Sequence, residues 1–208
     1  MSQPQTQTES RRMTAEEYLA VERTSPGRHE YVNGEVVAMT GASWPHVAVV
    51  ANLAVALDTQ LSPRGSRAVT NDLRVRIGAR REYVYPDVVV VCGQPELEEG
   101  VFDTLLNPVL IAEVLSPATR DYDRREKWEK YRQIASLRDY LVLSPERPHV
   151  ERYSRQDERF WLFSETVQFD AVLPLDSVGC TLALRDVYAG VLDTPAAAPR
   201  DLSSPGTE

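Results

Sequence analysis

The sequence lacks any apolar stretch that approaches the ~20 residues needed to span a bilayer. Its first residues are rich in Gln, Thr and Ser and contain no apolar signal-peptide segment, so a cytoplasmic protein is expected. Cysteine is scarce: Cys92 and Cys180 lie in apolar contexts and show no CxxC spacing. We therefore expect two buried free thiols rather than a disulfide or a zinc site.

The sequence also lacks a surplus of basic residues. It has 23 Lys and Arg against 31 Asp and Glu, a net charge of −8. This balance argues against a general nucleic-acid binder, which usually carries excess positive charge. The distribution is uneven, because six arginines lie between Ser62 and Tyr85. Both a local basic face and scattered, solvated charges fit that segment.

The length and the hydrophobic patterns predict one domain built from helices and strands. The 208 residues fit a single domain over 13–193, and the polar residues 1–12 and the Pro/Ala/Ser-rich residues 194–208 are expected to be disordered tails. A capping box at Thr14 and Glu17 starts the first helix, and Asn33-Gly34 predicts a type I′ hairpin. The predicted helices are 15–23, 44–61, 120–135 and 184–191. The predicted strands are 29–32, 35–39, 73–77, 85–92, 109–115, 139–143, 150–153, 160–164 and 168–173. This order predicts an α/β or α+β fold with a β-rich C-terminal part.

Two carboxylates lie where carboxylates are rare. Pro86-Asp87 opens a run of four valines, and Glu113 lies inside the apolar run 109–115. Each run is typical of a strand buried on both faces, where an unpaired charge is costly. If the two strands are neighbours, they lie roughly 5 Å apart. Both carboxylates could then reach one divalent cation, and oxygen ligands favour Mg²⁺ or Mn²⁺.

The next predicted helix supplies a basic residue. Asp123, Lys127, Lys130 and Tyr131 are spaced to share one helical face. A cation held by two acids can polarise a phosphodiester and activate water. Two acids and a nearby lysine therefore predict a metal-dependent phosphodiesterase.

These residues resemble a known signature. Pro86-Asp87 on one strand and Glu113 on the next look like the PD-(D/E)XK nuclease motif. Over residues 13–191 the chain resembles the Uma-two family, a bacterial family of restriction-endonuclease-like proteins once labelled a domain of unknown function. The resemblance rests on His29-Glu30-Tyr31-x2-Gly34-Glu35, His46, Pro86-Asp87, Glu113-Val114-Leu115-Ser116-Pro117-x-Thr119 and Asp123-x3-Lys127-x3-Tyr131. It implies a mixed β-sheet flanked by helices and a Mg²⁺- or Mn²⁺-dependent endonuclease that cuts DNA. We also expect a homodimer, because the family suggests one and because the edge strands of the β-rich end need cover.

The sequence departs from the nuclease pattern at Leu115, where a lysine is expected two residues after the glutamate. Residues two apart in a strand share a face, so a lysine at 115 would point with Glu113 at the metal, and leucine leaves that ammonium group missing. Lys127 is the natural replacement, because the resemblance includes it. We therefore predict Asp87, Glu113 and Lys127 as catalytic residues, and Asp87, Glu113 and Glu30 as metal ligands.

Each of these residues also has a structural interpretation. Asp87 could cap a strand or form an Asx turn. Glu113 could form a buried salt bridge, for example to Lys127 itself. Lys127 could pair with Asp123 on the surface, and Glu30 could be an exposed strand acid. His46 is interpreted as structural and His149 as a turn residue. Tyr131 is expected to pack in the core with its hydroxyl tethered, and the segment from Ser116 to Thr119 to cap a helix.

Leu115 and the net charge of −8 also fit a second class of function. The alternative is a catalytically inactive nuclease-fold protein that binds or assembles. A hydrolase of a small phosphate ester is a third possibility. The sequence leaves the substrate, the strand preference and the cut site undefined.

Overall fold

The computed structural model describes residues 12–39, 41–70, 72–100, 103–116 and 123–192, with the backbone alone for residues 123 and 124. The predicted tails, except for Arg12, and the predicted end of the domain at 193 fall outside this range. Within the described residues, no helix has both the length and the hydropathy that crossing a bilayer requires.

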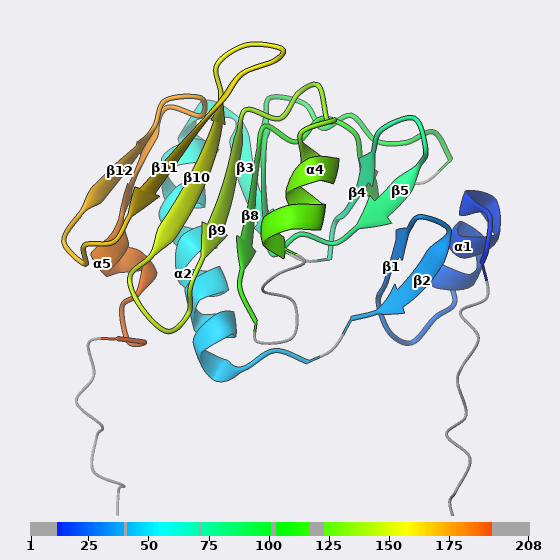
Figure 1. Cartoon of the computed structure of the whole chain (residues 1–208), viewed down its shortest axis with the longest axis horizontal. Coiled ribbons are helices and arrows are strands. Elements are labelled where there is room, and N and C mark those ends of the chain that lie inside the picture. Colours follow the sequence, from blue (N-terminus) through cyan, green and yellow to red (C-terminus); the bar gives the residue numbers. More distant parts are fainter. Residues whose placement is uncertain (1–11, 40, 71, 101–102, 117–122, 193–208) are drawn as a thin grey trace, which may run out of the picture.

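A six-stranded mixed sheet forms the centre of the molecule (Figure 1), in the order β11-β10-β9-β8-β6-β3. β8 and β9 are parallel and every other neighbouring pair is antiparallel. The strands are β3 (Ser66–Thr70), β6 (Val88–Cys92), β8 (Leu110–Val114), β9 (Asp139–Leu143), β10 (Val150–Arg155) and β11 (Trp161–Thr166). The three central strands β6, β8 and β9 match predicted apolar runs because both of their faces are covered.

A second, five-stranded sheet has the order β2-β1-β5-β4-β7. Its strands are β1 (His29–Val32), β2 (Glu35–Ala38), β4 (Arg74–Ile77), β5 (Glu82–Val84) and β7 (Thr104–Leu105). The predicted hairpin is confirmed, since Asn33 and Gly34 both take positive φ, at 54° and 83°. A separate hairpin pairs β12 (Val172–Leu175) with β13 (Cys180–Ala183).

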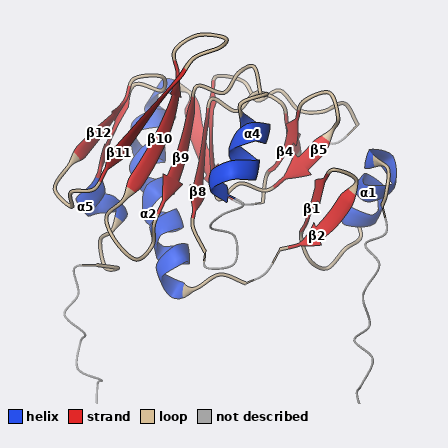
Figure 2. Cartoon of the chain, viewed as in Figure 1, coloured by secondary structure: helices blue, strands red, loops and turns tan. Residues whose placement is uncertain are grey.

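Helices cover the sheets, as Figure 2 shows by secondary structure. α1 (Ala15–Glu22) starts at the predicted capping box, and α2 (Trp44–Leu61) spans the predicted residues. A 3₁₀ turn, η1 (Ser62–Arg64), follows α2. A π-helical turn, η2 (Asp123–Lys127), leads into α4 (Trp128–Tyr131). The last helix is α5 (Leu184–Val187). The first residues of the helix predicted over 120–135, and most of its predicted cap, lie outside the described range.

Two cores fill the two faces of the central sheet. Val88 and Val90 pack with α2, whereas Val89 and Val91 pack with Tyr131 of α4. Alternation of this kind is expected because successive strand residues point to opposite faces. Any side chain on the α4 face of β6 or β8 therefore lies between this sheet and the segment that carries Lys127.

Several sequence predictions are wrong in detail. Cys92 is exposed, because it lies at the last position of β6, while Cys180 is buried and both thiols are free. The strand predicted over 168–173 begins only at Val172, because a turn closed by Ala171 N–H donating to Gln168 O precedes it. The predicted closing helix ends at Val187. The strands β3, β5, β7 and β13 were not predicted.

The run of arginines does not form a basic face. Arg74 is only 1% exposed, because Asp103, Thr104 and Tyr85 accept its hydrogen bonds and three tyrosine rings surround it. Arg67 pairs with Asp58, and Arg76 pairs with Glu98. Arg74 is thus neither part of a basic face nor a solvated charge, and Arg67 and Arg76 are paired with acids of the fold.

Candidate active site

Asp87 and Glu113 lie side by side on neighbouring strands. β6 and β8 are antiparallel, and Val88 lies opposite Ala112, so the next pair along the register places Asp87 opposite Glu113. Strand alternation assigns both to the face of Val89 and Ile111, which pack in the cluster that contains Tyr131. Glu113 is only 3% exposed. Asp87 Oδ2 accepts a 2.7 Å hydrogen bond from the amide of Val114, which fixes the carboxylate beside β8. The two acids thus lie on adjacent strand segments, as the sequence suggested.

Lys127 lies on the segment between β8 and β9 and contacts Glu113 of this pair. Its Nζ donates to Glu113 Oε1 at 3.0 Å and lies 3.5 Å from Glu30 Oε1. The ammonium is almost fully buried. A buried ammonium requires opposite charge nearby, and two carboxylates supply it here. Lys127 is therefore part of a buried ion cluster rather than one arm of an exposed surface pair.

Tyr131, four residues after Lys127, donates its hydroxyl hydrogen bond to the same Glu113 oxygen at 2.6 Å. Burial raises the pKa of this phenol well above its ordinary value, and the negative charges of Glu113 and Glu30 raise it further. The hydroxyl consequently remains a neutral donor. The predicted role of Tyr131 as a core residue with a tethered hydroxyl is confirmed.

Glu30 reaches the site from the second sheet. It lies in the middle of β1 and is buried, and its Oε1 accepts from the amide of Tyr85 at 3.4 Å. Tyr85 immediately precedes Pro86-Asp87, so the chain that leaves β5 connects the two sheets at this point. Glu30 is not an exposed strand acid, because the second sheet brings it against Lys127.

His46 also reaches the site, which the sequence analysis did not predict. The Ser43 side chain caps α2, and the first turn of the helix places His46 Nε2 3.2 Å from Asp87 Oδ1. Both side chains are nearly buried. The signal available in the sequence was the presence of His46 in the motif set that also contains Asp87.

Leu115 packs where a nuclease motif would place its lysine. It shares a face with Glu113 and lies in the same apolar cluster as Tyr131. Lys130, predicted on the same helical face as Lys127, instead donates to Glu82 Oε2 at 2.7 Å. The side chain of Asp123 lies outside the described residues. Of the predicted helical face, Lys127 and Tyr131 therefore reach Glu113.

The donor set fits a hard divalent cation. Carboxylate oxygens are the ligands that Mg²⁺ and Mn²⁺ prefer. Glu30 and Glu113 both contact Lys127, and the strand register places Asp87 beside Glu113, so three carboxylates are available near one another. Within the described part of the chain, these three do not meet as ligand atoms within 4.8 Å of one another.

A mixed sheet flanked by helices, with an acid on each of two adjacent strands and a buried lysine beside them, defines a protein of the restriction-endonuclease-like class. The Uma2 family model, described as "Putative restriction endonuclease", matches residues 15–185. The chain belongs to this family.

Two relatives from Synechocystis sp. have the names "Uncharacterized protein sll1609" and "Uncharacterized protein slr1290". The first is 33% identical over 74% of this chain and 86% of its own length. The second is 32% identical over 86% of this chain and 93% of its own length. A crystal structure from Anabaena variabilis, described as that of a "putative nuclease belonging to DUF820", superposes with a TM-score of 0.71 at 20% identity. That alignment covers 86% of this chain and 99% of the other, and it supports the same fold.

Proposed function

We propose that this protein is a divalent-metal-dependent endonuclease that hydrolyses DNA phosphodiester bonds in the cytoplasm. The observation that carries the proposal is the 3.0 Å contact between Lys127 Nζ and Glu113 Oε1, next to Asp87. Lys127, on the segment after β8, supplies the ammonium group that Leu115 cannot provide. The description of the Uma2 family and that of the Anabaena variabilis protein support the same reaction class.

Each residue has a defined part in this proposal. Asp87 and Glu113 would hold Mg²⁺ or Mn²⁺, and Glu30 would be the third carboxylate of the set. The bound ion supplies Lewis-acid activation of the phosphodiester and of water. Lys127 orients the attacking water or stabilises the charge that develops on phosphorus. Tyr131 holds the Glu113 carboxylate in place through its 2.6 Å hydrogen bond. The oxygen of water bonds to phosphorus, the P–O ester bond breaks, and the proton that the water loses ends on the leaving oxygen, which departs as an alcohol.

A thermal-shift measurement tests the metal site directly. Millimolar Mn²⁺ is expected to raise the melting temperature of the wild type, since a ligand at 100 times its Kd adds about 2.7 kcal/mol to the free energy of unfolding. Asp87→Asn is expected to lose this shift. Asp72→Asn, at an exposed acid that pairs with Arg28, is the matched control and is expected to keep it.

Plasmid cleavage then separates the two function classes. Mg²⁺- or Mn²⁺-dependent nicking that EDTA abolishes supports the nuclease. The alternative, an inactive binding or assembly protein, has one observation in its favour, because the Lys127 ammonium forms buried ion pairs with both Glu113 and Glu30. A folded wild type with no Mn²⁺ shift and no cleavage would establish that alternative.

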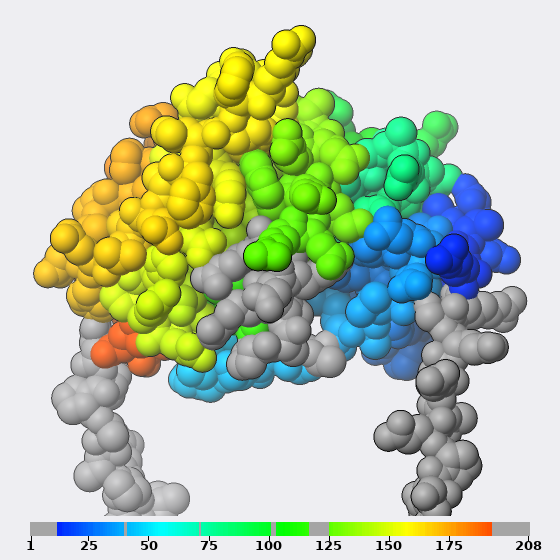
Figure 3. Space-filling view, in the orientation of Figure 1, coloured from blue at the N-terminus to red at the C-terminus, as the bar shows by residue number. Residues whose placement is uncertain are grey.

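We also propose that the protein is a homodimer that pairs through β11. This strand is an edge of the central sheet, and Leu162 and Phe163 on it, with Phe160 just before it, expose large apolar side chains. In the space-filling view, the loop between β10 and β11 forms the yellow projection at the top (Figure 3). An exposed apolar edge strand is a surface that native proteins normally cover.

Leu162→Glu is expected to convert the dimer to a monomer, because it places a charge in the covered edge. Light scattering coupled to gel filtration measures the mass. Val55→Glu, at an exposed apolar position on α2, is the control and is expected to remain dimeric. A monomeric wild type would contradict the proposal.

A further inference from the structure

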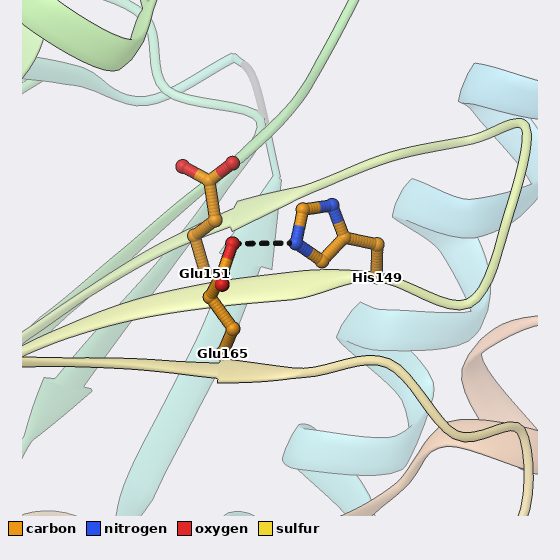
Figure 4. A group of neighbouring side chains, drawn as sticks. All are labelled: His149, Glu151 and Glu165. Carbon is orange, nitrogen blue, oxygen red and sulfur yellow. Dashed lines mark hydrogen bonds and ion pairs between the residues drawn. The ribbon is translucent and has the colours of Figure 1, made fainter.

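Three metal-ligating side chains gather on the last two strands of the central sheet, away from Lys127. Glu151 on β10 lies directly opposite Glu165 on β11 in the antiparallel register. His149 lies two residues before Glu151, so it shares that face. One ligand atom from each of the three lies within 4.8 Å of the others. Figure 4 shows a Glu165 oxygen facing the His149 ring, with the Glu151 side chain beside them.

The two carboxylates in this cluster repel each other. Like charges directly opposite each other on neighbouring strands destabilise a sheet. Glu151 is only 6% exposed, so solvent screens its charge weakly. The imidazole already lies against the second acid, through a 3.1 Å hydrogen bond between His149 Nε2 and Glu165 Oε1. A dication between these strands would therefore turn the repulsion of the two acids into attraction.

The backbone holds His149 firmly. The amide of His149 donates to the Tyr188 hydroxyl at 3.2 Å, and that hydroxyl in turn lies 3.1 Å from the His149 carbonyl oxygen. The same carbonyl accepts from the amide of Ser144 at 3.0 Å. His149 is buried, whereas the Glu165 side chain is 50% exposed. Two ligands are thus fixed inside the fold, and the third closes the site from the solvent side. The interpretation of His149 as a simple turn residue is wrong.

We propose that His149 Nε2 and the carboxylates of Glu151 and Glu165 form a second metal site, which binds a transition-metal dication of the Zn²⁺ type. An imidazole nitrogen combined with carboxylates favours Zn²⁺ and its neighbours over Mg²⁺. Two carboxylates and a neutral imidazole also match the charge of a dication. Three protein ligands leave a position open toward solvent.

This site is separate from the proposed nuclease centre. Across the sheet, Glu113 lies opposite Val142, and Val142 lies opposite Glu151. Two strand spacings separate Glu113 from Glu151, about 10 Å. The ions of a two-metal phosphodiesterase lie only about 4 Å apart. The second site is therefore not a partner ion of the Asp87–Glu113 pair, and it does not depend on the proposed reaction.

Binding of the ion would change the contact between Arg147 and His149. Arg147 Nη2 lies 3.3 Å from His149 Nδ1. Arginine only donates, so this contact favours the tautomer with the proton on Nε2. Metal binding at Nε2 moves that proton to Nδ1 and displaces the exposed Arg147 side chain. Arg147→Gln is consequently expected to leave Zn²⁺ affinity unchanged or to increase it.

Calorimetric titration of the EDTA-treated full chain with Zn²⁺ tests the proposal in an Asp87→Asn background, so that the other site does not contribute. We expect one bound Zn²⁺ per chain. Glu165→Gln, at the half-exposed ligand, should weaken binding by about tenfold or more. Glu158→Gln, at an exposed acid in the β10–β11 loop, is the matched control and should not.

Nuclear magnetic resonance of the ring protons gives a second readout, because the chain has only three histidines. Zn²⁺ should shift the His149 ring signals and leave those of His29 unchanged. Equal Zn²⁺ affinity in the background protein and in Glu165→Gln, with no shift at His149, would overturn the site. No Zn²⁺ binding by the folded background protein would do the same.

Discussion

Glu113→Gln is expected to lower the rate of Mg²⁺-dependent plasmid cleavage by about a thousandfold or more. The substitution replaces a charged metal ligand with a neutral amide. A metal ion contributes several kcal/mol of charge stabilisation, and about 4 kcal/mol corresponds to a thousandfold in rate. Only Asp87 and Glu30 of the proposed ligands then remain charged, so the Mn²⁺-induced rise in melting temperature should also shrink. Nicking rates with matched Mg²⁺ concentrations measure the effect.

The fold is expected to tolerate this change. Glutamine has nearly the same size, and its amide oxygen can still accept the Tyr131 hydroxyl hydrogen bond. Lys127 keeps Glu30 as a charged partner at 3.5 Å. Circular dichroism and a melting curve without metal should show a folded protein close to the wild type.

Glu82→Gln is the matched control for this experiment. Glu82 is a buried carboxylate of similar exposure, and it accepts from Lys130 at 2.7 Å and from the amide of Asn33 at 3.1 Å. Its loss disturbs a buried ion pair but removes no proposed metal ligand. Cleavage at the wild-type rate by folded Glu113→Gln would refute the proposed site. Equal losses in both variants would point to stability rather than chemistry.

The sequence predicts the centre of this fold better than its edges. The runs 85–92 and 109–115 are apolar throughout most of their length because both faces of β6 and β8 are buried. β7, by contrast, has only two residues, and β3 and β5 carry polar residues among the apolar ones. Such short, mixed segments lack a periodicity that separates them from loops. They become strands through pairing with neighbours that sequence spacing does not specify.

The same limit applies to the candidate site. Asp87 and Glu113 could be predicted because carboxylates in buried apolar runs are conspicuous. The approach of Glu30 and His46 depends on how the second sheet and the first turn of α2 meet the end of β6. That packing involves residues more than 40 positions apart in sequence. The His149 cluster depends on register as well, since a shift of one residue would move Glu165 to the opposite face.

Lys127→Met is expected to lower the cleavage rate by about a hundredfold to a thousandfold, the typical loss when one group that stabilises transition-state charge is removed. Methionine keeps much of the side-chain volume but carries no charge. The substitution also leaves Glu30 and Glu113 without their shared ammonium, so the free energy of unfolding should fall by about 3–5 kcal/mol in the absence of metal. Bound Mn²⁺ should restore part of that loss.

Lys130→Met separates catalysis from stability. Lys130 lies three residues further on, is buried to a similar extent, and pairs with the single carboxylate of Glu82. Its removal should destabilise the protein comparably, but Mn²⁺ should not compensate the loss and the cleavage rate should stay near the wild-type value. Cleavage is measured below both melting temperatures, with circular dichroism on the same samples. If Lys127→Met cut DNA as fast as Lys130→Met, Lys127 would be an arm of a structural ion pair, and Leu115 would mark a site that has no catalytic lysine.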